Sequence, residues 1–304
     1  MINRLIFGRP RRRRDLPAGP HAGFDISPLR LDRPDGATLN GWRAEPKSVQ
    51  EREKVLLYFG GRKEDAWWAP KMASYLEGWT VYSFNYRGFG DSKGSASEIN
   101  AKSDALAIYE FVMQTHCHTD TEMALMGRSL GTAIAIWLAH HVSPANLILV
   151  SPFCSMRSVL RSRFWLAPLS VFVRKRFMNS KLVPDISART LVILAARDKE
   201  VTHADSLKLA RSFGTQATVA VIEGTNHKTV PRSPETQRAV AGFLRNTERF
   251  TEIGNECRDR AIDSCPVGCS ESSPDKGTVP PDSSAQSFRK MPRRLEGKGY
   301  RLHG

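Results

Sequence analysis

The chain has 304 residues, of which 40% are hydrophobic and 9% aromatic, so it can bury one sizeable core. Five cysteines, an odd number without a C-x-x-C pair, argue against a disulfide framework and favour a reducing, cytoplasmic location. No apolar run approaches the length of a membrane span, and the run at residues 5–7 is too short for a signal peptide. We therefore expect one cytoplasmic domain with tails.

Composition and charge divide the chain into three parts. Residues 1–23 are rich in Arg, Pro and Gly, with four consecutive arginines at 11–14, and predict a basic flexible arm. Residues 251–304 are rich in Ser, Pro, Gly, Asp and Arg and predict a disordered tail, which leaves 24–250 as the folded domain. The formal net charge of +14 fits ordinary solubility, or attraction to an acidic membrane surface or an anionic substrate; nucleic acid is not expected as a partner.

Within residues 24–250, short apolar runs alternate with amphipathic segments. Residues 24–45 predict two strands around a turn at 34–36, and the apolar run at 54–59 is typical of a strand buried on both faces of a parallel sheet. This alternation predicts an α/β fold with a mostly parallel eight-stranded sheet flanked by helices, whose functional loops lie at the carboxyl ends of the strands. Further strands are expected at 80–86, 123–126, 146–150, 190–195 and 217–222, and helices at 66–77, 95–112, 129–142, 203–213 and 234–249.

The alternation pauses at residues 152–184, where aromatic and aliphatic residues are interleaved with Arg and Lys. Three interpretations fit this segment. It is a short helical lid that places apolar and cationic groups over a pocket, a segment that rests on an acidic membrane surface, or one or two ordinary surface helices with a solvated basic face.

The sequence GRSLG at residues 127–131 lies between a predicted strand and a predicted helix. A G-x-S-x-G at such a junction indicates a nucleophile elbow, a strained turn that exposes the serine hydroxyl. Gly127 and Gly131 are needed where strand and helix cross, and Ser129 then lies at a helix N-terminus, whose N–H groups favour a developing oxyanion. The pentapeptide alone also fits an ordinary turn, so its partners in the chain decide the interpretation.

Two candidate partners of Ser129 follow later strands. A serine hydroxyl is a weak nucleophile, and it needs a histidine base and an acid that orients the histidine. Asp198 follows the strand at 190–195 and His227 follows the strand at 217–222, which is the chain order expected for a G-x-S-x-G serine. His227 alone fits a surface loop and Asp198 alone a helix cap; their joint placement predicts a Ser–His–Asp triad.

Together these features resemble the α/β-hydrolase superfamily, in its branch of serine aminopeptidase-like or small-lidded acyl hydrolases. The resemblance covers most of residues 50–245 and is carried by segments 58–65 and 85–94, the elbow, and 151–153. It implies that the backbone N–H groups of Arg62 and Leu130 form the oxyanion hole. The sequence departs from the family at Gly60, where histidine is usual, and at residues 62–63, where Asn-Ala is common; the side chain of Arg62 binds an anionic substrate group or points to water.

The resemblance implies a serine hydrolase that cleaves ester, thioester or amide acyl bonds through an acyl-enzyme, with an ester favoured and a small or lipid-like acyl compound as substrate. Two alternatives stay open, a serine aminopeptidase-like peptidase and a non-catalytic scaffold that binds a hydrophobic ligand or partner. Neither a cofactor nor a metal is expected. His116, Cys117 and His118 are adjacent residues whose side chains alternate in direction, and no second pair of ligands is near.

Overall fold

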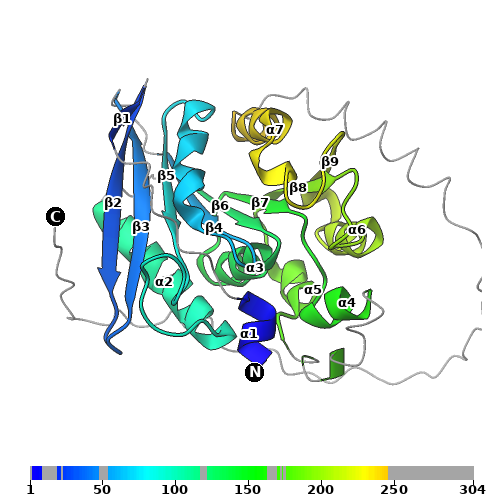
Figure 1. The fold of residues 1–304 in the computed structure, drawn as a ribbon. Helices are drawn as coiled ribbons and strands as arrows, with labels where there is room; N and C mark the ends of the chain where they lie inside the picture. The colour runs from blue at the N-terminus through cyan, green and yellow to red at the C-terminus, as the bar shows by residue number, and fades with distance from the viewer. Residues whose placement is uncertain are drawn as a thin grey trace, which may run out of the picture.

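The computed structural model describes residues 2–8, 19–21, 23–47, 54–116, 122–162, 170–171, 173 and 176–245. In this part of the chain one sheet of nine strands has the order β1-β2-β3-β5-β4-β6-β7-β8-β9 (Figure 1). The strands are β1 Gly19–His21, β2 Phe24–Asp32, β3 Thr38–Pro46, β4 Lys54–Phe59, β5 Trp79–Phe84, β6 Glu122–Arg128, β7 Asn146–Val150, β8 Arg189–Ala195 and β9 Ala217–Ile222.

The sheet is antiparallel at one edge and parallel through the rest. Strands β1 to β3 pair antiparallel, and β3 also pairs antiparallel with β5. From β5 through β4 to β9 every pairing is parallel. The predicted mostly parallel α/β sheet is therefore confirmed; its eight expected strands correspond to β2–β9, and the three-residue β1 adds one more at the edge.

Helices cover both faces of this sheet (Figure 1). The α-helices are α1 Ile2–Phe7, α2 Glu98–Thr115, α3 Leu130–Val142, α4 Met156–Arg161, α5 Asn179–Leu182, α6 His203–Arg211 and α7 Pro234–Leu244. The 3₁₀ helices are η1 Ala66–Ser74, η3 Val183–Asp185, η4 Gly214–Gln216 and η5 Val230–Arg232. No described helix is long and apolar enough to span a bilayer.

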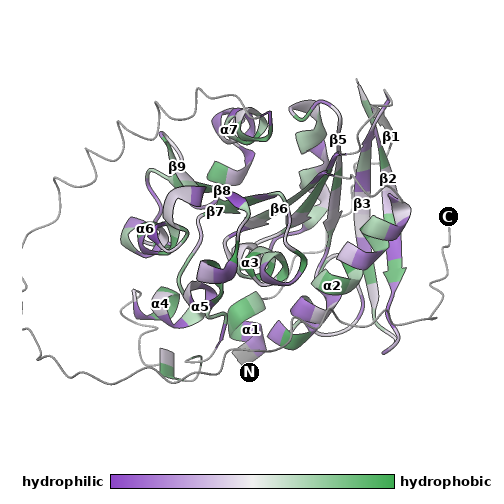
Figure 2. Cartoon of the chain, turned by 180° about the vertical axis from the view of Figure 1, so that it is seen from behind, coloured by the Kyte–Doolittle hydropathy of each residue, from purple (hydrophilic) through white to green (hydrophobic). Residues whose placement is uncertain are grey.

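The core lies in two layers because successive strand residues point to opposite faces. In β4, Val55 and Leu57 pack into the cluster beneath α1, α2 and α3, whereas Leu56 and Tyr58 pack into the cluster beneath η1 and α7. Helix α3 is apolar almost all round, as its green ribbon in Figure 2 shows, which is typical of a buried helix. Ser129, at the N-terminus of α3, is therefore fixed by core packing.

Three predicted helices differ from expectation. The helix predicted at 95–112 is α2, which Ser97 caps and which spans Glu98–Thr115. The segment predicted as a helix at 66–77 is the 3₁₀ helix η1, which contains Pro70; proline has no N–H to donate and disfavours a regular α-helix. Helix α7 begins after Ser233, whose side chain accepts from the N–H of Thr236, and ends at Leu244 rather than at the predicted residue 249. None of these differences moves a candidate site residue.

The predicted basic flexible arm at residues 1–23 is wrong at its start. Residues 2–7 form α1, and the side chains of Ile6 and Phe7 are only 2% and 1% exposed. These apolar side chains pack against the core, and the free energy gained by burying them stabilises the helix despite the polar residues around it. Three predicted segments lie wholly or partly outside the described residues. They are residues 9–18 of the arm, most of residues 163–175 within the predicted lid at 152–184, and the predicted disordered tail at 251–304.

Candidate active site

Ser129 occupies a strained turn between β6 and α3. Its φ of 50° and ψ of −115° lie in a region that non-glycine residues rarely adopt, and its N–H donates to the carbonyl of Val150 at 2.8 Å. A Cβ at Gly127 would collide with the backbone of Gly131, and a Cβ at Gly131 would collide with the carbonyl of Phe59. Both glycines are therefore needed for the close crossing of strand and helix.

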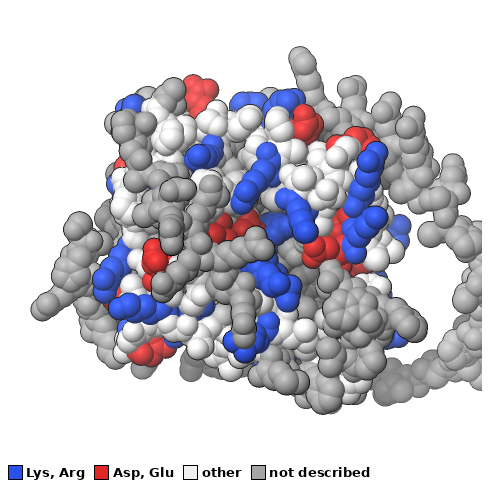
Figure 3. All heavy atoms as spheres, viewed as in Figure 1, with Lys and Arg blue, Asp and Glu red and all other residues white. Residues whose placement is uncertain are grey.

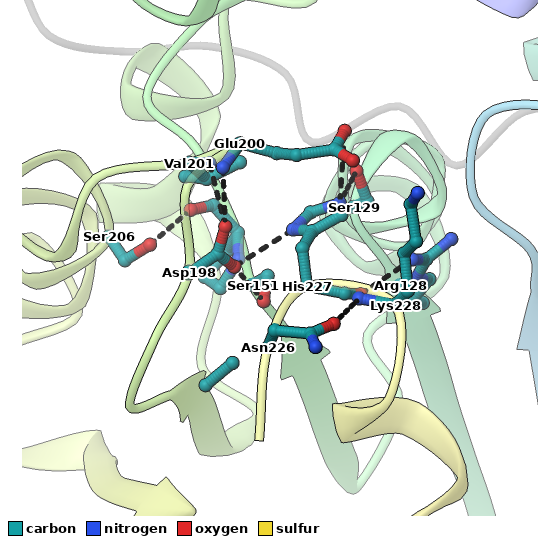
Figure 4. Close-up of polar contacts among 12 residues, drawn as sticks. Arg128, Ser129, Ser151, Asp198, Glu200, Val201, Ser206, Asn226, His227 and Lys228 are labelled. Carbon is teal, nitrogen blue, oxygen red and sulfur yellow. Dashed lines mark hydrogen bonds and ion pairs between the residues drawn. The ribbon is translucent and has the colours of Figure 1, made fainter. Parts of the chain in front are cut away.

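Three side chains meet at the carboxyl ends of β6, β8 and β9 (Figure 4). His227 Nδ1 lies 2.8 Å from Asp198 Oδ2, and His227 Nε2 lies 3.0 Å from Ser129 Oγ. Because an ionised carboxylate only accepts hydrogen bonds, His227 Nδ1 carries the proton and Nε2 accepts from the Ser129 hydroxyl. The structure thus brings together the three residues that the sequence predicts as a triad.

Asp198 is held by donors on both of its oxygens. Ser151 Oγ donates to Oδ2 at 2.8 Å, and the N–H groups of Glu200 and Val201 donate to Oδ1 at 2.8 and 2.9 Å. Burial raises the pKa of Asp198, but the hydrogen bond and charge of His227, with the donors Val201 and Ser151, lower it more, to about 2. Asp198 is therefore ionised at neutral pH and fixes the orientation of the imidazole.

The loop that contains Arg62 is organised by a buried carboxylate. Glu64 Oε2 accepts from the N–H of Gly61 at 2.6 Å, and Glu64 Oε1 accepts from Tyr58 Oη at 2.8 Å and from Trp68 Nε1 at 2.6 Å. Burial and the nearby Glu64 raise the pKa of Tyr58, so its phenol remains a protonated donor. The hydrogen bonds of Glu64 consequently fix the predicted oxyanion loop against Tyr58 and Trp68.

Arg128 connects that loop to His227. Its Nη1 donates to Glu64 Oε2 at 3.1 Å, and its Nη2 donates to the carbonyl of His227 at 2.6 Å. The two charged side chains are only 7% and 10% exposed for Glu64 and Arg128. Neither role was predicted from the sequence, although both residues lie in motifs that carry the resemblance: Arg128 is the first variable position of the elbow and Glu64 belongs to the segment 58–65.

Ser129 opens into a pocket of about 480 Å³, within the range of small-molecule sites. The predicted oxyanion residues Arg62 and Leu130 both line it beside Ser129. Its apolar lining comes from Leu5, Ile6, Leu130, Phe153, Met156, Val159, Leu160 and Val201. Its polar lining comes from Arg62, Lys63, Arg128, Ser129, Glu200, His227 and Lys228.

The charged groups of the pocket include one acid, Glu200, that was not predicted from the sequence. Glu200 is 41% exposed, and its Oε2 lies 3.9 Å from His227 Nε2. The Arg62 side chain is directed toward α1, because its Nε donates to the carbonyl of Leu5 at 3.1 Å. Basic and acidic side chains are interspersed over the face of the molecule seen in Figure 3, in keeping with the solubility interpretation of the charge.

His116, which was weighed with Cys117 and His118 as a metal ligand, does not line this pocket. His116 Nε2 is hydrogen-bonded to the buried Tyr82 hydroxyl at 2.8 Å, and Cys117 and His118 lie outside the described residues. Among the residues that the structure describes, no group of three His, Cys, Asp or Glu side chains is placed to hold a metal ion.

Comparisons with known proteins agree with this fold. Residues 50–183 match the family model described as Serine aminopeptidase, S33. An uncharacterized protein of Mycobacterium tuberculosis is 28% identical over 208 residues, which is 68% of this chain and 73% of that protein. The lysophosphatidylserine lipase ABHD12 of Xenopus tropicalis is 32% identical over 201 residues, which is 57% of this chain; the match spans 51%, about half, of the lipase.

Solved structures resemble the chain at low sequence identity. The esterase Pf2001 of Pyrococcus furiosus has a TM-score of 0.60 at 15% identity, covering 78% of this chain and 96% of the esterase. Est1E from Butyrivibrio proteoclasticus has a TM-score of 0.59 at 16% identity, covering 71% of this chain and 97% of Est1E. With the parallel sheet, these structures show that the chain has the fold of the α/β hydrolases, as its motifs predict, and residues 50–183 are similar to a family of hydrolases with that fold.

Proposed function

We propose that the protein is a serine hydrolase that cleaves carboxylic esters through a covalent acyl-enzyme on Ser129. The observation that carries this proposal is the continuous hydrogen-bonded series from Ser129 Oγ to His227 (3.0 Å) and from His227 to Asp198 (2.8 Å). The strained backbone of Ser129 supports it, because such strain is typical of catalytic positions.

In the proposed mechanism His227 Nε2 takes the proton of the Ser129 hydroxyl as Oγ attacks the ester carbonyl carbon. Asp198 stabilises the imidazolium that forms. The backbone N–H groups of Arg62 and Leu130 stabilise the oxyanion of the tetrahedral intermediate. His227 then gives its proton to the leaving alcohol, and a water molecule repeats the sequence on the acyl-enzyme to release the carboxylic acid and regenerate Ser129.

The pocket lining supports an apolar acyl chain as the group transferred to Ser129. Apolar side chains from α1, α3, α4 and the loops before α4 and after β8 line the pocket, whereas Lys63 and Lys228 are exposed at its polar part. Relatives of this chain include lipases named for lysophosphatidylserine. An ester of a fatty acid with an anionic alcohol part is the substrate class that best fits both features.

Turnover of p-nitrophenyl butyrate tests the proposal. Wild-type protein is expected to hydrolyse the ester, and Ser129→Ala to lose nearly all of this activity because no other nucleophile takes its place. Ser74→Ala is the matched control, since Ser74 is exposed and its hydroxyl donates only to the Lys71 carbonyl. Equal activity in Ser129→Ala and wild type, or no activity in either, would contradict the proposed reaction; the second result would favour a non-catalytic scaffold.

A peptidase is a second candidate because of Glu200. Its carboxylate lines the pocket 3.9 Å from His227 Nε2, where it could pair with the amino group of a peptide substrate. A panel of acyl esters and aminoacyl p-nitroanilides, measured on one preparation, separates the two functions. Higher kcat/KM for the anilides, lost on Glu200→Gln, would favour the peptidase; higher kcat/KM for esters, retained in Glu200→Gln, would favour the esterase.

A further inference from the structure

Helix α1 forms one wall of the pocket that contains Ser129. Leu5 and Ile6 both line this pocket, and the side chain of Ile6 is almost wholly buried. In Figures 1 and 2 alike, α1 lies next to α3 and α5, at the same end of the molecule as α4. The apolar lining thus comes from α1, from residues in and just before α4, and from Leu130 and Val201.

Two hydrogen bonds to backbone carbonyls of α1 hold this helix against the predicted oxyanion loop. Arg62 Nε donates to the carbonyl of Leu5 at 3.1 Å, and the N–H of Lys63 donates to the carbonyl of Phe7 at 3.1 Å. Lys63 has a φ of 59°, so the loop turns sharply where it meets α1. The helix is therefore hydrogen-bonded directly to Arg62, the residue whose N–H is proposed to bind the oxyanion.

An aromatic contact also holds the last residue of α1. Phe7 packs edge-on against Tyr86 and Phe177, with ring centroids 5.7 and 6.3 Å apart. Tyr86 in turn donates its hydroxyl to the carbonyl of Gly60 at 2.8 Å. Because Phe177 comes from the segment predicted as the lid, α1 bridges the oxyanion loop and that segment, and its wall has a fixed position.

We propose that Leu5 and Ile6 are specificity-determining residues that limit the length of the acyl chain accepted beside Ser129. This inference rests on the proposed acyl-ester function. An acyl chain bound to Ser129 occupies the apolar part of the pocket, because Lys63, Glu200 and Lys228 make the remainder polar. Extension of the chain toward α1 is stopped by the side chains of Leu5 and Ile6.

Changes to this wall are expected to alter chain-length preference rather than chemistry. Ile6→Ala enlarges the apolar space, so the ratio of kcat/KM for p-nitrophenyl dodecanoate to that for the butyrate should rise about tenfold. Ile6→Trp fills the space and should lower the same ratio about tenfold, since even one methylene in such a pocket changes discrimination by roughly 10–200-fold. The butyrate should change much less in both variants, because its acyl chain is short.

Two further variants keep the test decisive. Leu5→Trp narrows the same wall at a less buried position and replaces Ile6→Trp if that variant does not fold. Leu31→Ala removes a buried apolar side chain in β2, outside the pocket lining, and should leave the ratio unchanged. A ratio that is the same in wild type, Ile6→Ala and Leu5→Trp would overturn the proposed wall while leaving the esterase proposal intact.

A binding measurement tests the wall without turnover. In a Ser129→Ala background, calorimetry with butyrate and dodecanoate reports the fit of the chain alone. Dodecanoate should bind about tenfold more weakly once Leu5→Trp is added, with butyrate little changed. If wild-type protein does not hydrolyse esters but this binding pattern is seen, the esterase proposal is wrong and the proposed role of Leu5 and Ile6 stands. Unchanged dodecanoate binding in the variant would contradict that role.

Discussion

Removing the carboxylate of Glu64 should weaken both the fold and the proposed oxyanion hole. Glu64 accepts hydrogen bonds from Gly61, Tyr58, Trp68 and Arg128. In Glu64→Gln one acceptor oxygen becomes an amide that can only donate, so the two donors that faced that oxygen lose their acceptor. Breaking a buried ion pair by removing one partner costs about 3–5 kcal/mol of unfolding free energy.

Thermal and chemical denaturation measure this cost. For a domain of this size a loss of 3–5 kcal/mol lowers Tm by roughly 10 °C. Because the Gly61 N–H loses its anchor, kcat for p-nitrophenyl butyrate should also fall, by up to about 10²–10³, the cost of one oxyanion donor. The double variant Glu64→Gln/Arg128→Met should be less destabilised than the sum of the single variants, since the two residues share one interaction.

The matched control is Arg30→Met. Arg30 pairs with Asp32 at 3.0 Å, but their side chains are 51% and 42% exposed, so this pair contributes at most about 1 kcal/mol. If Glu64→Gln is no more destabilised than Arg30→Met and retains full kcat, the buried pair does not support the loop.

Three further predictions concern Asp198. Asp198→Asn should keep the fold but lower kcat about 10⁴-fold, because an amide favours the wrong tautomer of His227; near-normal kcat would contradict the orienting role. The folded pKa of Asp198, about 2, lies below the unfolded value of 3.8. Ionised Asp198 therefore contributes about 2 kcal/mol to the free energy of unfolding, a contribution that is present above about pH 4 and is lost as the pH falls toward 2. The stability difference between wild type and Asp198→Asn, measured by denaturation, should therefore narrow below about pH 4, and a difference constant from pH 6 to pH 3 would contradict this. Ser151→Ala removes one donor to Asp198 and should cost about 1 kcal/mol in stability with a loss in kcat below tenfold; a loss as large as that of Asp198→Asn would instead indicate a direct role.

The central strands could be predicted from sequence because they are buried on both faces. The apolar runs at 54–59 and 146–150 coincide with β4 and β7, and the run at 190–195 lies in β8. Ser129, Asp198 and His227 could be named for the same reason: each follows such a run, and the carboxyl ends of parallel strands lie at one edge of a sheet.

Features that depend on contacts between distant segments could not be predicted. Helix α1 is short and lies in an arginine-rich stretch, and its burial depends on Tyr86 and Phe177, which lie far away in the chain. Glu64 and Arg128 are 64 residues apart, and isolated charged residues normally indicate solvent exposure rather than a buried pair. The lining role of Glu200 likewise appears only once the loop after β8 is placed beside His227.

We infer that the His227–Asp198 pair activates the Ser129 hydroxyl for attack on an acyl group. The most direct measurement is mass spectrometry of the folded protein after treatment with a fluorophosphonate. One adduct per chain is expected, located on Ser129, with labelling slowed strongly in His227→Ala. An unlabelled Ser129 in the folded protein, or labelling at the same rate in His227→Ala, would contradict it.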